Sequence, residues 1–323
     1  MKIYSKQLLK EAERDLGIYA QFVRGQNITV KNCWHFYTDG SAAESMFYDC
    51  EDFRQGTNRI SVVASNYEIL ILAYVLMDTH VHFVLYGSFD ECNKFVHEYM
   101  RRTSMVISAR HSSLHSLQHV PIGYQAIDND WYLKKAICYT IKNPVEAGMH
   151  YNPYDYPWSS AALYFRESGI WTSPSWINII PNMGKVADFC NRKQENILNT
   201  RHIANSDLLM IGDMIFPGEF VAYELVERIF KTHKAYTKIM FTTKDEDIES
   251  RGGVISSLTI PIQEMRILKN KLCKEMFGTD SSKNLDMRQR VMLARKLKAR
   301  YNSSTKQIAR ICGLVYNEVK GMI

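Results

Sequence analysis

The chain has 323 residues, of which 46% are hydrophobic and 23% are charged. These are ordinary globular values, and they exclude disorder or a coiled coil as a description of the whole chain. The length predicts two domains, or one domain with a long extension. The longest apolar run, residues 69–77, is too short to cross a bilayer, and the charged N-terminus lacks the apolar core of a signal peptide, so no membrane partner is expected. Seven scattered cysteines without a CxxC pair indicate reduced thiols and a cytoplasmic protein.

Positive charge is concentrated at the C-terminal end. From Val254 onward the chain holds 14 Lys and Arg against 5 Asp and Glu, whereas the remainder holds 26 against 29. Such asymmetry is typical of a protein with a polyanionic partner, most simply nucleic acid. The alternative is a basic helical face that only meets solvent.

The first half of the chain alternates strand and helix patterns. β-Branched and aromatic residues predict strands over residues 28–39, 67–77 and 81–86. Helical spacing predicts helices over residues 91–110 and 130–142. Pro144 disfavours helical geometry at the residue before it, so the second helix is expected to end at Asn143. Together these elements predict an α+β fold with an antiparallel sheet and helices on one of its faces.

The second half is expected to be mainly helical. Residues 152–176 are rich in Pro, Trp, Tyr and Ser and predict an irregular segment. Helices are predicted over residues 220–234, 262–277, 288–301, 305–312 and 316–323, with a linker at 244–257. This pattern divides the chain into residues 1–165, a connecting segment over 166–216, and a helical C-terminal domain over 217–323.

His80 and His82 are the sharpest local feature. Alternate residues of a strand share one face, so both imidazoles are expected to project the same way. Two histidines on one face can hold a divalent metal and leave coordination positions open for a substrate oxygen. The alternative is two ordinary histidines beside a turn.

A second group of polar residues lies on the predicted helix over 130–142 and just after it. Tyr139 and Asn143 are four residues apart and share a helical face. Asn143 can offer an amide oxygen to a metal, tyrosine is a known covalent nucleophile, and Lys142 can meet a phosphate. The alternative is that Tyr139 is one of many core tyrosines.

Two other groups of residues are weaker candidates for a site. Asp49 and Asp52 do not form a convincing carboxylate pair, so a two-metal nuclease is not favoured. His111, His115 and His119 have helical spacing but lie in a Ser-rich stretch.

Three segments together resemble a known family. Residues 74–83 (YVLMDTHVHF), 139–148 (YTIKNPVEAG) and 156–160 (YPWSS, followed by Tyr164) resemble, in the same order, motifs of the single-tyrosine HUH transposases, including the REP-associated tyrosine transposases. The resemblance covers roughly residues 18–165. It implies a ferredoxin-like or RRM-like fold for this part of the chain.

The resemblance also implies a chemistry. His80, His82 and Asn143 would bind Mg²⁺ or Mn²⁺, and Tyr139 would attack a phosphodiester of single-stranded or hairpin DNA. That attack would leave a 5′-phosphotyrosine and a free 3′-OH, and a second 3′-OH could reverse the step and rejoin DNA. A homodimer is compatible with these features.

The C-terminal region carries a separate DNA-binding pattern. A capping Ser or Thr, a small Ala309 and a Gly313 four residues later predict a helix-turn-helix over about residues 304–323. It resembles the C-terminal domain of the replication initiator DnaA or Trp-repressor-like modules, and a plain helical bundle is the alternative. Duplex DNA is the expected partner of this region. The residues expected to contact DNA in the whole chain are Lys142, Arg295, Lys298, Lys306 and Arg310.

Two functions are compatible with these sequence features. The first is a metal-dependent tyrosine transposase or site-specific nickase that acts on single-stranded DNA. The second is a catalytically silent DNA-binding regulatory protein that has kept the fold and the basic C-terminal region. The presence of all four site residues, His80, His82, Tyr139 and Asn143, favours the first, because a protein that only binds DNA has no need of them.

Overall fold

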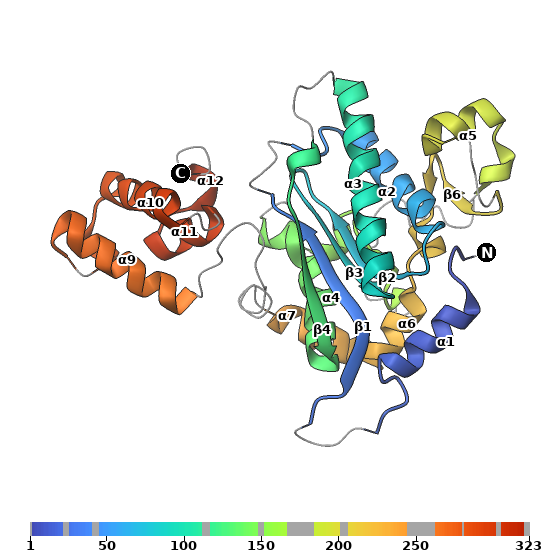
Figure 1. Cartoon of the computed structure of the whole chain (residues 1–323), viewed down its shortest axis with the longest axis horizontal. Coiled ribbons are helices and arrows are strands. Elements are labelled where there is room, and N and C mark those ends of the chain that lie inside the picture. Colours follow the sequence, from blue (N-terminus) through green and yellow to red (C-terminus); the bar gives the residue numbers. More distant parts are fainter. Residues whose placement is uncertain are drawn as a thin grey trace. The chain divides into compact units, whose positions relative to one another are not determined.

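The computed structural model describes residues 2–21, 26–40, 45–111, 117–147, 152–166, 184–200, 206–243, 262–279, 281–301 and 305–319. The chain divides into two compact units, Met1–Lys244 and Asp245–Ile323 (Figure 1). In the part of the chain that the structure describes, no helix has the length and apolar character of a membrane span.

A four-stranded antiparallel sheet forms the centre of the first unit. Its strands are β1 (Thr29–Thr38), β2 (Leu70–Leu76), β3 (Val81–Tyr86) and β4 (Ile122–Asn129), in the spatial order β2-β3-β1-β4. Helix α2 (Cys50–Ala64) lies between β1 and β2 in the chain, and α3 (Phe89–His111) lies between β3 and β4. This β-α-β-β-α-β order is that of a ferredoxin-like fold. The predicted α+β class, with a mainly helical C-terminal region, is confirmed.

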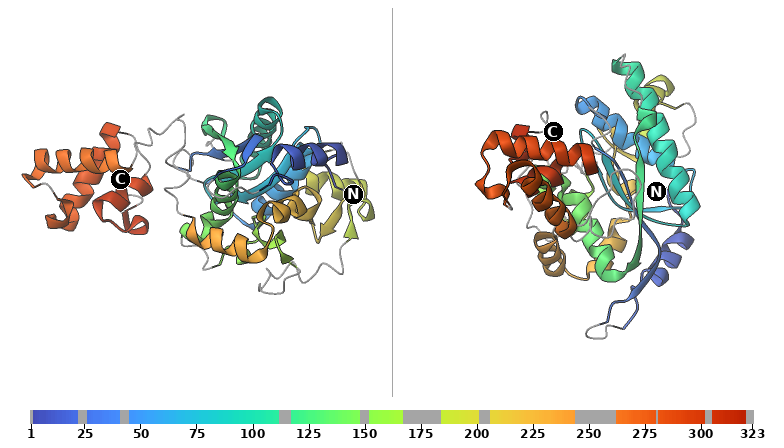
Figure 2. Two further views of the ribbon diagram at one scale, coloured as in Figure 1. Left: turned by 90° about the horizontal axis from the view of Figure 1, so that it is seen from below. Right: turned by 60° about the vertical axis from the view of Figure 1, so that its left-hand side comes forward.

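Helices cover both faces of this sheet (Figures 1 and 2). On one face Phe83 packs edge-on against Phe95 and Tyr99 of α3, with ring centroids 5.4 and 5.2 Å away. Helix α4 (Asp130–Glu146) contacts the strands from the other side, an addition to the one-sided helical layer expected from the sequence. Strands β2 and β3 are buried at every position, so apolar side chains on both of their faces require cover.

Helix α4 does not end at Asn143 as predicted but continues through Pro144 to Glu146. Proline has no N–H, so the carbonyl of Thr140, four residues earlier, loses its helical donor. The side-chain amide of Asn143 donates to that carbonyl (3.4 Å) and to the carbonyl of Tyr139 (3.0 Å). This side chain replaces the missing backbone donor and lets the helix run on.

The segment after α4 closes the outer edge of β2. The backbone N–H of Leu76 donates to the carbonyl of Trp158 (2.9 Å), and that of Ser160 donates to the carbonyl of Tyr74 (3.0 Å). The hydroxyl of Tyr156 donates to the carbonyl of Leu76 (2.6 Å). An exposed strand edge invites pairing with other chains, so the YPWSS segment has a structural function as edge cover.

The remaining elements of the first unit flank this core. They are α1 (Lys6–Asp15), β5 (Gly184–Lys185), α5 (Asn191–Leu198), β6 (Leu209–Ile211), β7 (Met214–Ile215), α6 (Tyr223–Phe230) and α7 (His233–Thr242), with 3-10 turns at Leu117–His119, Pro153–Asp155, Ala161–Leu163, Val186–Asp188 and Pro217–Glu219. The helix predicted over 220–234 is thus two helices. Lys231 has a positive φ (67°) and ends α6, and the side chain of Thr232 caps α7. Both helices pack on α4, which explains why the unit extends to Lys244, beyond the boundary expected near residue 217.

The second unit is a small helical bundle. Its helices are α9 (Ile262–Phe277), α10 (Met287–Tyr301), α11 (Thr305–Cys312) and α12 (Tyr316–Val319), with a 3-10 turn at Ser282–Asn284. Gly313, with φ 69°, makes the turn after α11, and the N–H of Leu314 donates to the carbonyl of Ala309 (2.8 Å). Residues 304 and 320–323 of the predicted helix-turn-helix lie outside the described residues. The core of this unit includes Leu272, Cys273, Leu293, Leu297, Ile308, Ala309, Cys312 and Val319.

Candidate active site

His80 and His82 stand at the start of β3, where a tight turn leads in from β2. The N–H of Met77 donates to the carbonyl of His80 (2.8 Å) and closes this turn. The two imidazole rings lie 5.1 Å apart between centroids, nearly at right angles. His82 is 5% exposed and His80 is partly exposed. Gly40 passes so close that a Cβ there would lie 2.8 Å from Nδ1 of His80, so this approach requires glycine.

Helix α4 brings two further polar side chains to these histidines. Oδ1 of Asn143 lies 3.4 Å from Nε2 of His80. The ring of Tyr139 stands edge-on to that of His82 at 5.6 Å. Because the amide nitrogen of Asn143 is engaged with the carbonyls of Tyr139 and Thr140, its oxygen is the atom turned toward His80. The four residues singled out from the sequence therefore lie together, on the sheet face opposite α3.

The side chains of this cluster fit a small divalent cation. Imidazole nitrogens suit divalent transition metals, and a neutral amide oxygen suits Mg²⁺ or Mn²⁺. Adjacent ligands of an octahedral ion with bonds of 2.0–2.1 Å stand about 3 Å apart. The separation of 3.4 Å between Nε2 of His80 and Oδ1 of Asn143 is close to that value. His80, Tyr139 and Asn143 are all partly exposed, so a large substrate can reach them.

Sequence reasoning missed a third histidine at this site. His35 lies on β1, is 1% exposed, and has Nε2 3.1 Å from Nδ1 of His82. Its ring is stacked on that of His82 (5.3 Å, 16°) and edge-on to that of Tyr139 (5.8 Å, 81°). Burial lowers the pKa of His35 to about 4, so the ring is neutral near pH 7. The available signal was a lone histidine between Trp34 and Phe36, in the aromatic half of a predicted strand.

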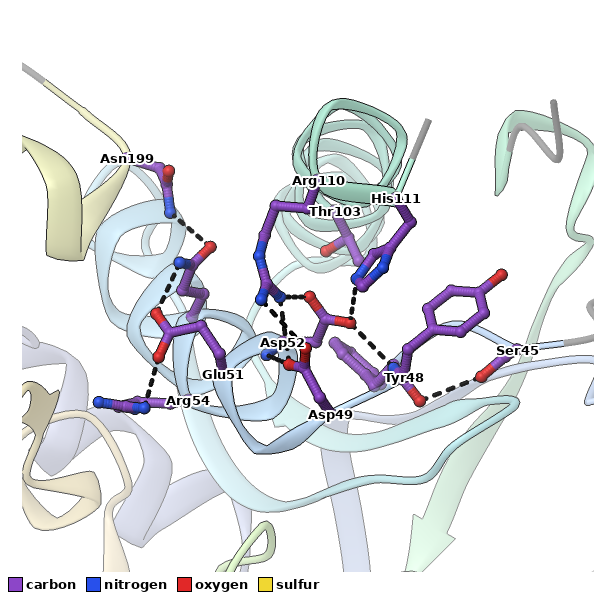
Figure 3. Close-up of polar contacts among 12 residues, drawn as sticks. Ser45, Tyr48, Asp49, Glu51, Asp52, Arg54, Thr103, Arg110, His111 and Asn199 are labelled. Atoms are coloured by element: carbon purple, nitrogen blue, oxygen red, sulfur yellow. Dashed lines mark hydrogen bonds and ion pairs between the residues drawn. The ribbon is translucent and has the colours of Figure 1, made fainter. Parts of the chain in front are cut away.

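A different cluster joins α2 to α3 on the other side of the sheet (Figure 3). Asp49, Asp52 and His111 hold ligand atoms within 4.8 Å of one another. The carboxylate of Asp52 is 1% exposed and accepts from the backbone N–H of Tyr48 (2.9 Å), while its Oδ2 lies 2.7 Å from Nε2 of His111. Arg110 forms ion pairs with both carboxylates. The guanidinium already supplies the positive charge that a metal would bring, so these residues fit an ion-pair network better than a metal centre.

Lys142 is turned away from the cluster on α4. Its side chain is 13% exposed, its Nζ donates to the carbonyl of Thr243 (2.9 Å), and it pairs with Glu146 (3.0 Å). It thereby caps the C-terminal end of α7. These contacts give Lys142 a structural role that the sequence did not indicate.

The other expected DNA contacts belong to the second unit. Arg295 and Lys298 lie on α10, and Arg310 lies on α11; Arg295 and Arg310 are exposed. Lys306 lies on α11, and its side chain is outside the described residues. A cavity of about 200 Å³ is lined by Arg266, Lys269, Asn270, Arg310 and Ile311.

Comparison with known proteins gave one solved structure of interest. No family model matches the chain, and no curated protein matches it. The structure of a REP-associated tyrosine transposase bound to a REP hairpin is similar to 47% of this chain and 88% of its own chain, with 16% sequence identity and a TM-score of 0.36.

Proposed function

We propose that the first unit cleaves and rejoins single-stranded DNA through a 5′-phosphotyrosine on Tyr139, with Mg²⁺ or Mn²⁺ as cofactor. The observation that carries this proposal is the convergence of His80, His82, Asn143 and Tyr139 from two distant segments. Oδ1 of Asn143 lies 3.4 Å from Nε2 of His80, and the Tyr139 ring stands 5.6 Å from the His82 ring. A metal-binding group beside an accessible phenol is what tyrosine-dependent phosphoryl transfer requires.

Each side chain has a defined task in this proposal. His80, His82 and Asn143 hold the cation, which would stabilise negative charge on the phosphate oxygens. The Oη atom of Tyr139 forms a bond to phosphorus, and the bond from phosphorus to the 3′-oxygen breaks. The phenol gives up one proton and the departing 3′-oxygen gains one, so the step is balanced. Attack by a 3′-OH on the phosphotyrosine reverses it and joins DNA without an external energy source.

The second unit is proposed to bind the DNA near the cleavage position, as a helical domain with a helix-turn-helix built on α11 and α12. Arg310 and the neighbouring cations around the cavity of about 200 Å³ support this role. Arg295, Lys298 and Lys306 are proposed to contact phosphates as well. Hairpin DNA is the preferred substrate in this proposal, in line with the hairpin named for the similar solved structure.

A labelled-oligonucleotide assay tests the proposal. Single-stranded DNA that covers both flanks of the gene is incubated with the full chain and MnCl₂, and covalent protein–DNA adducts are resolved on denaturing gels. The expected result is an adduct that requires Mn²⁺ and disappears in His80→Ala. The matched control is His119→Ala, a histidine on an exposed position outside the site, which should retain the adduct. Binding of the same DNA without any adduct would overturn the enzyme and favour a catalytically silent DNA-binding protein.

A further inference from the structure

The contact between His35 and His82 supports a role for one more residue at the candidate site. This inference rests on the proposed function. Residue 35 pairs with Val84 across the β1–β3 ladder, and Tyr37 pairs with His82, so His35 is the diagonal neighbour of His82 on the face below α4. The two rings are stacked and joined at 3.1 Å between Nε2 of His35 and Nδ1 of His82.

We propose that His35 is a positioning residue that holds His82 in the tautomer and orientation able to bind the metal through Nε2. A neutral imidazole carries its proton on one nitrogen only. For Nε2 of His82 to coordinate a cation, the proton must reside on Nδ1, where it needs an acceptor. Nε2 of His35 is the atom placed to accept it. Histidine ligands commonly donate their second N–H to such a partner, which fixes the ring.

The burial of His35 argues against a role in packing alone. Its neighbour on the strand, Phe36, fills the opposite face at 0% exposure without any polar atom. His35, at 1% exposure, places an Nδ1 in the interior that has no hydrogen-bond partner among the described residues. An apolar side chain would avoid that cost, and polar atoms left unsatisfied in a core tend to mark a functional requirement.

Mn²⁺ binding to the full chain tests this role without DNA, with the signal of free Mn²⁺ measured by electron paramagnetic resonance. His35→Phe keeps an aromatic ring but removes the acceptor, and should weaken Mn²⁺ binding by about 10- to 100-fold, the usual cost of losing such a partner. His35→Gln can place an amide oxygen near Nδ1 of His82 and should recover most of that loss. Urea unfolding of both variants measures their stability separately from metal binding.

The outcomes distinguish this inference from the proposed function. Unchanged Mn²⁺ affinity in His35→Phe, or an equal loss in both variants, overturns the positioning role if His80→Ala still abolishes binding. Unchanged affinity in His80→Ala overturns the metal site itself and this inference with it. Nitrogen NMR of the Mg²⁺-loaded wild-type protein provides a test that needs no variant of residue 35. The His82 ring should carry its proton on Nδ1, and a proton on Nε2 contradicts the proposal.

Discussion

Replacing Asp52 with asparagine tests whether the Asp49, Asp52 and His111 cluster is an ion-pair network or a metal centre. Asn keeps the volume of the side chain and one acceptor oxygen but removes the negative charge. The carboxylate of Asp52 is 1% exposed and accepts from the N–H of Tyr48 in addition to its contacts with Arg110 and His111. Asp52→Asn therefore weakens three contacts in a place where water cannot replace them.

The size of the effect follows from these contacts. A hydrogen bond to a charged group contributes about 1.5–3 kcal/mol and one between neutral groups about 0.5–1.5 kcal/mol, so the substitution should cost roughly 2–3 kcal/mol of unfolding free energy. Asp49→Asn is the matched control, because Asp49 also pairs with Arg110 but its side chain is 48% exposed. Asp49 is also the N-cap of α2, where its side chain accepts from the N–H of Asp52, and Asn is a comparably good cap. An exposed ion pair is worth about 0.2–1 kcal/mol, so the control should cost at most about 1 kcal/mol.

Urea unfolding of the full chain, with and without MnCl₂, measures both the stability of each variant and its response to Mn²⁺. We expect a larger loss of stability for Asp52→Asn than for Asp49→Asn, and the same response to Mn²⁺ in wild type and Asp52→Asn. Equal losses in the two variants would refute the estimate of the buried network. A stabilisation by Mn²⁺ that vanishes in Asp52→Asn and persists in His80→Ala would show that the cluster binds metal.

Three further outcomes are expected. Asn143→Ala should raise the Mn²⁺ concentration for half-maximal adduct formation on the order of tenfold, or 1.4 kcal/mol, and an unchanged metal titration would leave Asn143 with a structural role only. Lys142→Met should lower the unfolding free energy by about 1 kcal/mol through loss of the bond to Thr243, with an unchanged salt slope of DNA binding; a slope smaller by about one would reveal a phosphate contact. Hydrogen bonds from Arg101 and Arg102 lower the pKa of Glu98 to about 2, so Glu98 stabilises the fold above pH 4.5 and loses this effect as the pH falls toward 2. Glu98→Gln should thus cost about 0.5–1 kcal/mol in urea unfolding at pH 7 and only a small part of that at pH 2, and an equal cost at both pH values would contradict the ion pair.

The strands and helices that carry regular patterns could be predicted from the sequence, and those with buried polar residues could not. Strands β1, β2 and β3 lie within the predicted strand segments, and α3 matches its predicted helix closely. Helix α2 was not predicted, because its buried face includes polar residues such as Asn58, which accepts from the N–H of Ile215 (2.7 Å). Such a bond to a distant segment forms only in the folded chain, so no local sequence pattern predicts it.

Strand β4 was missed for a related reason. Its buried positions include Gly123 and Gln125, whereas Tyr124 is 41% exposed, so hydrophobicity and burial do not alternate together over these residues. Glycine is required at position 123, because a Cβ there would lie 2.6 Å from the ring of Tyr37. The residue type at this position is determined by the close approach of the two strands and not by hydrophobicity.

The candidate site was likewise predictable within single elements but not between them. The spacing of His80 and His82, and of Tyr139 and Asn143, placed each pair on one face of its own element. That the two pairs meet is a tertiary fact, which the sequence indicated only through the resemblance to a family. His35 lies on a strand that was predicted, but its contact with His82 depends on the register of β1 against β3, which the sequence does not reveal.

The proposed phosphotyrosine chemistry is decided by the identity of the tyrosine that becomes linked to DNA. The covalent adduct formed with Mn²⁺ and single-stranded DNA is digested with trypsin and nuclease, and the modified peptide is sequenced by mass spectrometry. Tyr37 provides the matched control, since its ring also lies near that of His82, at 6.0 Å. We expect a nucleotide on Tyr139, an adduct that survives Tyr37→Phe, and no adduct in Tyr139→Phe. A modified peptide that contains another tyrosine, or an adduct that persists in Tyr139→Phe, would contradict it.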